Sequence, residues 1–136
     1  MGRMRTGSFM LYQGTHAHPK AMVRLEGTSL KVGTTGDFAP RLHVKLVDGW
    51  EKDGNWGGYL QITSDAYEGY YIDSSSGWLT PVSSKVDPIT FFDRGDWYEI
   101  WQKDPEHDGR PITIADNEQL RFVKGATGDH FNILDS

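Results

Sequence analysis

The sequence predicts an all-β domain of roughly 10 to 12 short strands, and three observations lead to this prediction. Short runs of alternating apolar and polar residues recur along the chain, as expected for strands with one buried face. Clusters of Gly, Asp, Asn and Thr separate these runs and are typical of turns. Helical periodicity is weak, because 16 glycines and 6 prolines interrupt almost every stretch that is long enough for a helix.

The alternating runs predict strands at defined places. In chain order, they are Met22–Leu25, Leu42–Val47, Tyr59–Thr63, Ile89–Phe92, Ile112–Ile114 and Leu120–Val123. Within each run the apolar residues alternate, so one face of the strand is predicted to enter the core. The predicted turns between them are Thr34–Asp37, Asp53–Asn55, Asp93–Gly95, Asp108–Gly109 and Gly125–Gly128.

The length of the chain predicts one domain. With 136 residues, it can hold one hydrophobic core and is too short for two ordinary domains. Residues 8–136 are predicted to form this domain. Residues 1–7 are basic and are interpreted as an N-terminal arm or a cloning remnant, because no long apolar run follows them.

One pattern, apolar-x-apolar-apolar-Asp, occurs three times. It is found at Val44–Asp48, Ile89–Asp93 and Phe131–Asp135, and its aspartates are 45 and 42 residues apart. An aspartate at such a position is expected to end its strand through a side-chain turn. A glycine and a tryptophan follow the first two copies, which predicts that Trp50 and Trp97 occupy matching positions.

A second pattern precedes each of these aspartates. Val23–Leu25, Leu60–Ile62 and Ile112–Ile114 are matched alternating runs that begin 25, 33 and 23 residues before their aspartate. The middle repeat is therefore predicted to contain eight to ten extra residues, around Ser74–Ser84. Because the two patterns recur together, they indicate an internal threefold repeat.

Three repeats of this length, each with about four strands, resemble the β-trefoil superfamily. The resemblance implies a short six-stranded barrel capped at one end by three hairpins. The Gln-x-Trp motif of ricin-type lectins is missing at the matching positions, whereas Gly57–Ile62 is closer to fascin-like or agglutinin-like trefoils. Such proteins serve in glycan binding, actin bundling or protein docking, and some trefoils of this size inhibit proteases. A small β-barrel or β-sandwich is the alternative fold.

Composition argues against several classes of function. The absence of Cys excludes a disulfide scaffold and thiol catalysis. A net charge of −5 argues against a nucleic-acid partner. No membrane span is expected, since the chain has no apolar run of about 18 residues. The short run Phe9–Tyr12 does not encode a signal peptide, so the expected localisation is cytoplasmic, or released without such a peptide.

Aromatic residues make up 12 % of the chain and are predicted to form two groups. The first group is expected in the core, because bulky residues recur at matching places in the repeats. It contains Phe91, Trp97, Phe122 and Phe131. The second group consists of Trp56 and Trp78, which are flanked by turn residues, and of tyrosines that lie between them in the sequence.

The second group predicts a ligand site. An exposed aromatic ring stacks on the C–H face of a sugar, and neighbouring carboxylates and amides bind its hydroxyl groups. The predicted ligand-binding residues are Trp56, Trp78, Tyr67, Tyr70, Asp53, Asn55, Asp65 and Asp73. The same composition also suits a protein interface, or rings that only cover the hairpin cap.

The sequence therefore predicts a non-catalytic, lectin-like protein that binds a glycan through the middle repeat. The first alternative is a protein ligand, bound by a docking module or protease inhibitor through the loop at residues 74–87. The second alternative is a metal-dependent enzyme using His16 and His18 with Glu26, because imidazoles two residues apart on a strand point the same way. No catalytic residue and no cofactor are assigned, and the oligomeric state stays open.

Overall fold

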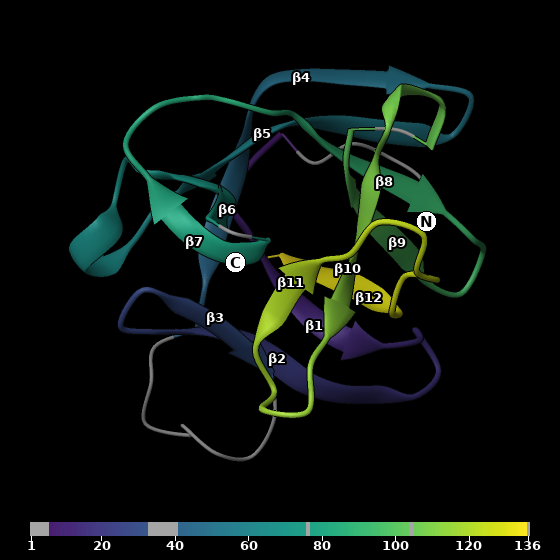
Figure 1. Ribbon diagram of the computed structural model, residues 1–136, viewed down its shortest axis with the longest axis horizontal. Coiled ribbons are helices and arrows are strands. Elements are labelled where there is room, and N and C mark those ends of the chain that lie inside the picture. Colours follow the sequence, from purple (N-terminus) through teal and green to yellow (C-terminus); the bar gives the residue numbers. More distant parts are fainter. Residues whose placement is uncertain (1–5, 33–40, 76, 104, 136) are drawn as a thin grey trace.

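Strands dominate the computed structural model, which describes residues 6–32, 41–75, 77–103 and 105–135 (Figure 1). The described residues form twelve strands and two short 3-10 helices, which confirms the all-β prediction. The strands are β1 (Phe9–Gly14), β2 (Pro19–Glu26), β3 (Ser29–Val32), β4 (His43–Lys52), β5 (Asn55–Ile62), β6 (Tyr71–Ser75), β7 (Trp78–Val82), β8 (Ile89–Asp93), β9 (Tyr98–Gln102), β10 (Arg110–Ile114), β11 (Leu120–Phe122) and β12 (Phe131–Asp135). The 3-10 helices are η1 (Asp65–Tyr67) and η2 (Pro105–His107).

Six of the strands close a ring through antiparallel pairing. The pairs are β1–β4, β4–β5, β5–β8, β8–β9, β9–β12 and β12–β1. Closure satisfies the hydrogen-bonding edges that an open sheet would expose. The remaining strands form three hairpins, β2–β3, β6–β7 and β10–β11. The hairpins touch one another where Arg121 pairs with Trp78 and Lys31 pairs with Gln119.

The chain follows the same order three times: a ring strand, a hairpin and a second ring strand. The three copies are β1–β4, β5–β8 and β9–β12, and the repeated aspartate pattern falls on the last strand of each. Asp93 ends β8 as predicted, because its Oδ1 accepts a hydrogen bond of 2.8 Å from the Gly95 amide. The expectation is wrong for Asp48, where β4 continues to Lys52 through an irregular step with a φ of 53°.

The second repeated pattern is matched correctly in only two copies. Val23–Leu25 lies on β2 and Ile112–Ile114 on β10, which are the first strands of their hairpins. Leu60–Ile62 instead lies on the ring strand β5, so its match was wrong. The equivalent residue in the middle hairpin is Ile72 of β6, which is 21 residues before Asp93. The middle copy therefore has no eight- to ten-residue excess.

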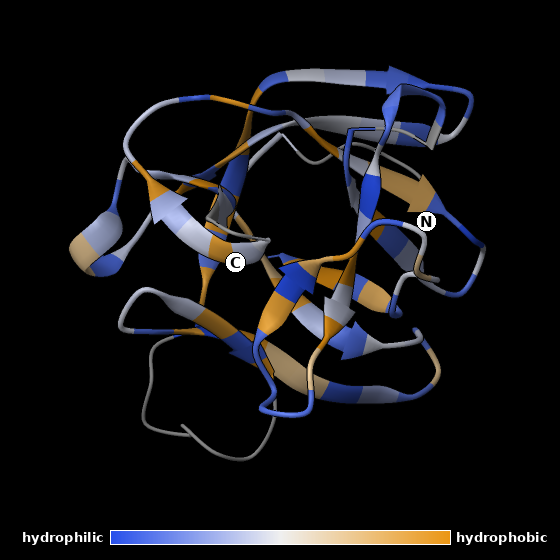
Figure 2. Cartoon of the chain, viewed as in Figure 1, coloured by the Kyte–Doolittle hydropathy of each residue, from blue (hydrophilic) through white to orange (hydrophobic). Residues whose placement is uncertain are grey.

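Aromatic rings fill the centre of the ring of strands. Phe9, Trp56 and Tyr98 come from the beginnings of β1, β5 and β9, and each is at most 1 % exposed. Phe91 of β8 packs against all three rings. Figure 2 shows the corresponding pattern of apolar stretches on the strands and hydrophilic residues in many of the connections. The core is thus built from the three copies together.

Several expectations concern residues outside the described part of the chain. The turn at Thr34–Asp37 and residues 1–5 of the predicted arm lie there, as does Ser76 of the predicted loop. Within the described residues, no helix is long and apolar enough to cross a membrane.

Candidate functional site

An irregular step in β4 brings Trp50 to the surface. The pairing of β4 with β5 shifts register between Val47 and Trp50, so two residues on β4 have no direct partner on β5. Trp50 is 39 % exposed as a residue, which is unusual for the largest apolar side chain. Trp50 was expected to match core positions, and this expectation is wrong, because the irregular step turns its side chain to the outer face.

A glycine beneath Trp50 allows the indole to lie close against the backbone. Trp50 pairs with Gly57 of β5, and a Cβ atom on Gly57 would lie 2.7 Å from Cζ2 of Trp50. The same Cβ would lie 2.3 Å from the Ile89 carbonyl oxygen. Only a residue without a side chain fits there, and Gly57 therefore positions the Trp50 ring.

The pairing of β4, β5 and β8 decides which side chains surround Trp50 on the outer face of the sheet. One row across the strands runs from Trp50 through Gly57 to Thr90, and the next row runs from Lys52 to Asn55. Because side chains alternate along a strand, these residues share the outer face while Trp56 and Phe91 point into the core.

A cleft of about 450 Å³ lies over this part of the outer face. It is lined by Trp50, Lys52, Asp53, Asn55, Thr90, Phe92 and Glu106. The Asp-Gly turn between β4 and β5 closes one side, with φ values of 55° at Asp53 and 81° at Gly54. Such a two-residue turn with positive φ matches the twist of the flanking strands, so the hairpin that presents Asp53 is well defined. Figure 1 shows this long hairpin at the top of the molecule.

Hydrogen bonds and ring contacts hold the side of the cleft that Asn55 and Phe92 form. Asn55 Oδ1 accepts a 3.0 Å hydrogen bond from the Asp93 amide, which fixes the orientation of its side chain. Phe92 lies edge-on to Trp101 with ring centroids 6.0 Å apart, and the Arg94 guanidinium lies 5.5 Å from the Phe92 centroid. Arg94 is itself held by Glu99, at 2.7 Å. These contacts restrain the side chains of Asn55 and Phe92.

The chemistry of the cleft combines aromatic surface with hydrogen-bonding groups. Trp50 and Phe92 offer apolar faces, while Thr90 and Asn55 offer a hydroxyl and an amide. Two carboxylates and one ammonium group, from Asp53, Glu106 and Lys52, complete the lining. Such a site suits a polar ligand that also has an apolar face.

Two of the eight residues predicted to bind ligand, Asp53 and Asn55, line this cleft. Trp56 does not, because its ring is fully buried and stacks on Phe91 with centroids 4.0 Å apart. The expectation that Trp56 is an exposed stacking residue is therefore wrong. Its turn-rich surroundings reflect the tight β4–β5 hairpin, while its side chain points inward.

Asp73 was also predicted as a ligand-binding residue, but its carboxylate is 4 % exposed and already bonded. It accepts hydrogen bonds from the Ser74 amide at 2.8 Å, the Asp87 amide at 3.1 Å and Gln102 Nε2 at 2.6 Å. A buried carboxylate with three donors holds structure together. Asp73 thus fixes the segment before β8, and its predicted role at a surface site is wrong.

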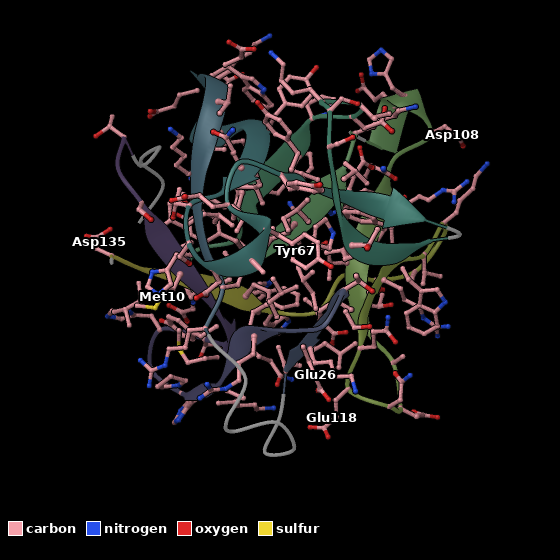
Figure 3. All side chains as sticks on the ribbon, turned by 90° about the vertical axis from the view of Figure 1, so that its left-hand side faces the viewer. Met10, Glu26, Tyr67, Asp108, Glu118 and Asp135 are labelled. Atoms are coloured by element: carbon pink, nitrogen blue, oxygen red, sulfur yellow. The ribbon has the colours of Figure 1, made fainter. Side chains whose placement is uncertain are left out.

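The four other predicted residues do not gather at the cleft. Asp65 is exposed and begins η1, and Tyr67 and Tyr70 pack edge-on with centroids 5.4 Å apart. Figure 3 shows Tyr67 near the middle of the face that carries η1, away from Asp108 at the upper right. Trp78 is half-buried on β7, where the Arg121 guanidinium lies 5.4 Å from its ring. The eight predicted residues are therefore spread over the cleft, the core, the η1 segment and the β6–β7 hairpin.

The predicted loop at residues 74–87 is shorter than expected. Tyr71 to Ser75 pairs with Trp78 to Val82, so most of the segment is the β6–β7 hairpin. The remaining connection, residues 83–88, carries Val86 with 62 % exposure. Lys85 bonds Asp48 of β4 at 2.7 Å, which raises the pKa of Lys85 through that hydrogen bond and the attraction of the carboxylate.

The residues of the predicted metal site do not meet. His18 precedes β2 and Glu26 ends it, so the strand separates them by about 26 Å at the usual rise per residue. Glu26 instead pairs with Lys31 at 3.4 Å, and Figure 3 shows it in the lower part of the molecule, above Glu118. No group of three potential metal ligands occurs among the described residues.

Sequence reasoning missed five residues of the cleft: Trp50, Lys52, Thr90, Phe92 and Glu106. One signal was available for Trp50: it is followed by four polar or turn residues, Glu51 to Gly54, as expected near the tip of a hairpin. No local signal identifies Glu106, because it reaches the cleft from η2, far along the chain.

The comparisons with known proteins give no information on the site. No protein-family model matches the chain, and a search of curated proteins finds no match in sequence.

Proposed function

We propose that the chain is a β-trefoil. The support is its topology: six strands close a ring, three hairpins touch one another, and the order strand, hairpin, strand occurs three times. The aromatic cluster of Phe9, Trp56 and Tyr98 adds to this, because each copy contributes one ring from the same strand. An open sandwich would not close such a ring of pairings.

We further propose that the protein is a non-catalytic carbohydrate-binding protein and that the Trp50 cleft is its site. The observation that carries this proposal is Trp50, 39 % exposed as a residue and fixed on Gly57 beside Asn55, Asp53 and Glu106. A sugar ring has an apolar C–H face and a rim of hydroxyl groups. The indole suits the face, and the carboxylates and the amide suit the rim.

The cleft also favours a neutral ligand over an acidic one. Two carboxylates, Asp53 and Glu106, face one ammonium group, Lys52. An anionic sugar would meet a net negative lining and would be disfavoured by like-charge repulsion. The proposed ligand class is therefore a neutral glycan.

A glycan array followed by titration tests this proposal. Trp50→Ala is expected to weaken binding of any neutral glycan that the wild type retains by at least about tenfold, or about 1.4 kcal/mol. Tyr70→Ala is the matched control, because Tyr70 is 40 % exposed and lies outside the cleft. Equal loss in both variants, or no neutral glycan bound by the folded wild type, would refute the proposal.

A second candidate function is protein docking through residues 83–88, and one observation favours it. Val86 is 62 % exposed at a position fixed on both sides, by Lys85 on Asp48 and by the Asp87 amide on Asp73. A braced loop that presents an apolar side chain loses little entropy on binding a partner. Inhibition of a protease panel by wild type, lost in Val86→Asp and kept in Trp50→Ala, would support this function over glycan binding.

A further inference from the structure

A second cleft, separate from the Trp50 cleft, lies beside the turn between β1 and β2. Its volume is about 350 Å³, and it contains no residue of the Trp50 cleft. The side chains that line it are Gln13, Thr15, His18, Lys20, Asp129 and His130. They come from both ends of the chain, because β1 pairs with β12.

A buried amide holds the two walls of this cleft together. Asn132 is 3 % exposed, and its Nδ2 donates hydrogen bonds to the Gly14 carbonyl at 3.3 Å and the Asp96 carbonyl at 2.9 Å. The Gly14 amide donates to the His130 carbonyl at 2.8 Å, and the His16 amide donates to the Asp96 carbonyl at 2.8 Å. The backbone of the turn is therefore joined to the segments before β9 and before β12.

Gly14 is required by this arrangement. Its φ is 123°, and a Cβ atom there would lie 2.5 Å from the His18 carbonyl oxygen. The turn closes tightly because Gly14 has no side chain, and the His18 amide bonds Thr15 Oγ1 at 3.0 Å. His18 and Lys20 are thereby presented to the cleft from one wall.

His130 is presented from the opposite wall by a ring stack. Its imidazole lies on the indole of Trp97, with centroids 4.0 Å apart and planes inclined by 20°. Stacking restrains the plane of the imidazole, and either ring nitrogen can donate a hydrogen bond when it is protonated. His130 is exposed to solvent on the cleft side of this stack.

The charges of the cleft are unusual for an acidic protein. Lys20 and the imidazoles of His18 and His130 make no ion pair with a carboxylate in the described part of the chain. Among the described residues of the lining, Asp129 is the only acidic one, and its Oδ2 accepts a 2.7 Å hydrogen bond from the Ile114 amide. The lining therefore offers three groups that can donate hydrogen bonds to an anion, from Lys20, His18 and His130. Its one carboxylate, Asp129, already accepts a backbone hydrogen bond.

We propose that this cleft binds a small oxyanion, a carboxylate, sulfate or phosphate group, between Lys20 on one wall and His130 on the other. Lys20 supplies the charge and the two imidazoles donate hydrogen bonds, while Asn132 holds the backbone of the β1–β2 turn that carries His18 and Lys20. The volume accommodates the anionic group of a small molecule or of a larger ligand that ends there.

Amide NMR titration of the full chain with sodium sulfate, phosphate and acetate tests the proposal, with chloride keeping ionic strength constant. Saturable shifts are expected at residues 14–20 and 128–130. Lys20→Gln is expected to weaken binding roughly five- to tenfold, the loss of one charge-assisted hydrogen bond. His130→Phe keeps a ring on Trp97, removes both nitrogens and is expected to weaken binding as well. The three anions distinguish carboxylate, sulfate and phosphate ligands.

Lys45→Gln is the matched control, because it removes one exposed positive charge outside the cleft. It is expected to leave the anion affinity unchanged. Shifts spread over all surface lysines, or equal weakening in Lys20→Gln and Lys45→Gln, would overturn the proposal. The proposal would also be overturned if Lys20→Gln and His130→Phe both bound the anion with wild-type affinity. Folding of each variant is checked by the dispersion of the same spectra.

Discussion

The rings of Trp56 and Phe91 stack in the centre of the protein, with centroids 4.0 Å apart and planes inclined by only 7°. The two residues face each other across β5 and β8, so the register of these strands brings the rings together. Phe9 and Tyr98 meet the Trp56 ring edge-on, at 6.0 and 5.5 Å. This stack joins the first, second and third copies of the repeated unit in one core.

Truncation of Trp56 is expected to destabilise the protein strongly. Trp56→Ala removes a fully buried ring and leaves a cavity, at a cost of about 3–5 kcal/mol. Trp56→Phe keeps a stacked ring and removes an indole N–H that has no hydrogen-bond partner, so its cost is smaller. Denaturant unfolding of both variants measures the difference. An unfolding free energy of Trp56→Ala within about 1 kcal/mol of wild type would show that the ring is not core.

The contrast between Trp56 and Trp50 shows what sequence reasoning could and could not predict. Both residues are next to turn residues and glycines, so composition alone does not separate the buried one from the exposed one. The irregular step at Asp48 decides the face of Trp50, because it shifts the register of β4 on β5, whereas Trp56 keeps the inward alternation of Leu60 and Ile62 along β5. A shift of one residue exchanges the two faces of a strand, and no local pattern predicted this one.

Strands and turns were easier to predict than their equivalence between repeats. The alternation in Ile112–Ile114 and the side-chain turn at Asp93 depend on neighbouring residues, and both were predicted. The equivalence of Ile72 with Val23 depends on which strands pair across the molecule. The cleft was predicted only in part, because its lining also depends on contacts between distant parts of the chain. Glu106, for example, reaches the cleft from a different copy.

A side chain at Gly57 is expected to displace Trp50. The Cβ atom of Gly57→Ala would lie 2.3 Å from the Ile89 carbonyl oxygen and 2.7 Å from the indole, so both must move. We expect a loss of stability of roughly 1–3 kcal/mol and a changed environment for Trp50. Unfolding and tryptophan fluorescence measure the two effects. Gly7→Ala is the control, since nothing lies within 4 Å of its added Cβ, and comparable effects in both variants would contradict this account.

Removal of the Asp73 carboxylate is expected to loosen residues 83–88. Asp73→Ala leaves the Asp87 amide and Gln102 Nε2 without their acceptor, at a cost of about 1–3 kcal/mol for each buried donor. Gln102 retains weaker contacts with Ser74 Oγ and Asp87 Oδ2, at 3.3 and 3.2 Å, which reduces the total. Faster amide exchange at residues 84–88 measures the effect. Unchanged exchange in this segment, with normal unfolding, would exclude the bracing role.

Alkaline conditions are expected to destabilise the protein partly through Tyr12. Tyr12 lies on β1 opposite Met22 of β2, and partial burial raises the pKa of its phenol above the ordinary value of about 10. The phenol therefore ionises more readily in the unfolded chain than in the folded one. Its contribution to stability is complete below about pH 10 and is lost as the pH rises through the higher folded pKa.

Tyr12→Phe removes this ionisation and is the variant that isolates it. The melting temperatures of wild type and Tyr12→Phe are expected to differ by a constant amount up to about pH 9. Above about pH 10 the wild type is expected to lose stability faster than the variant, because only its unfolded chain gains a phenolate at this position. Thermal unfolding monitored across this range measures both slopes. Parallel curves above about pH 10 would mean that the phenol of Tyr12 has the same pKa in the folded and unfolded chains. Burial would then not raise the pKa of Tyr12.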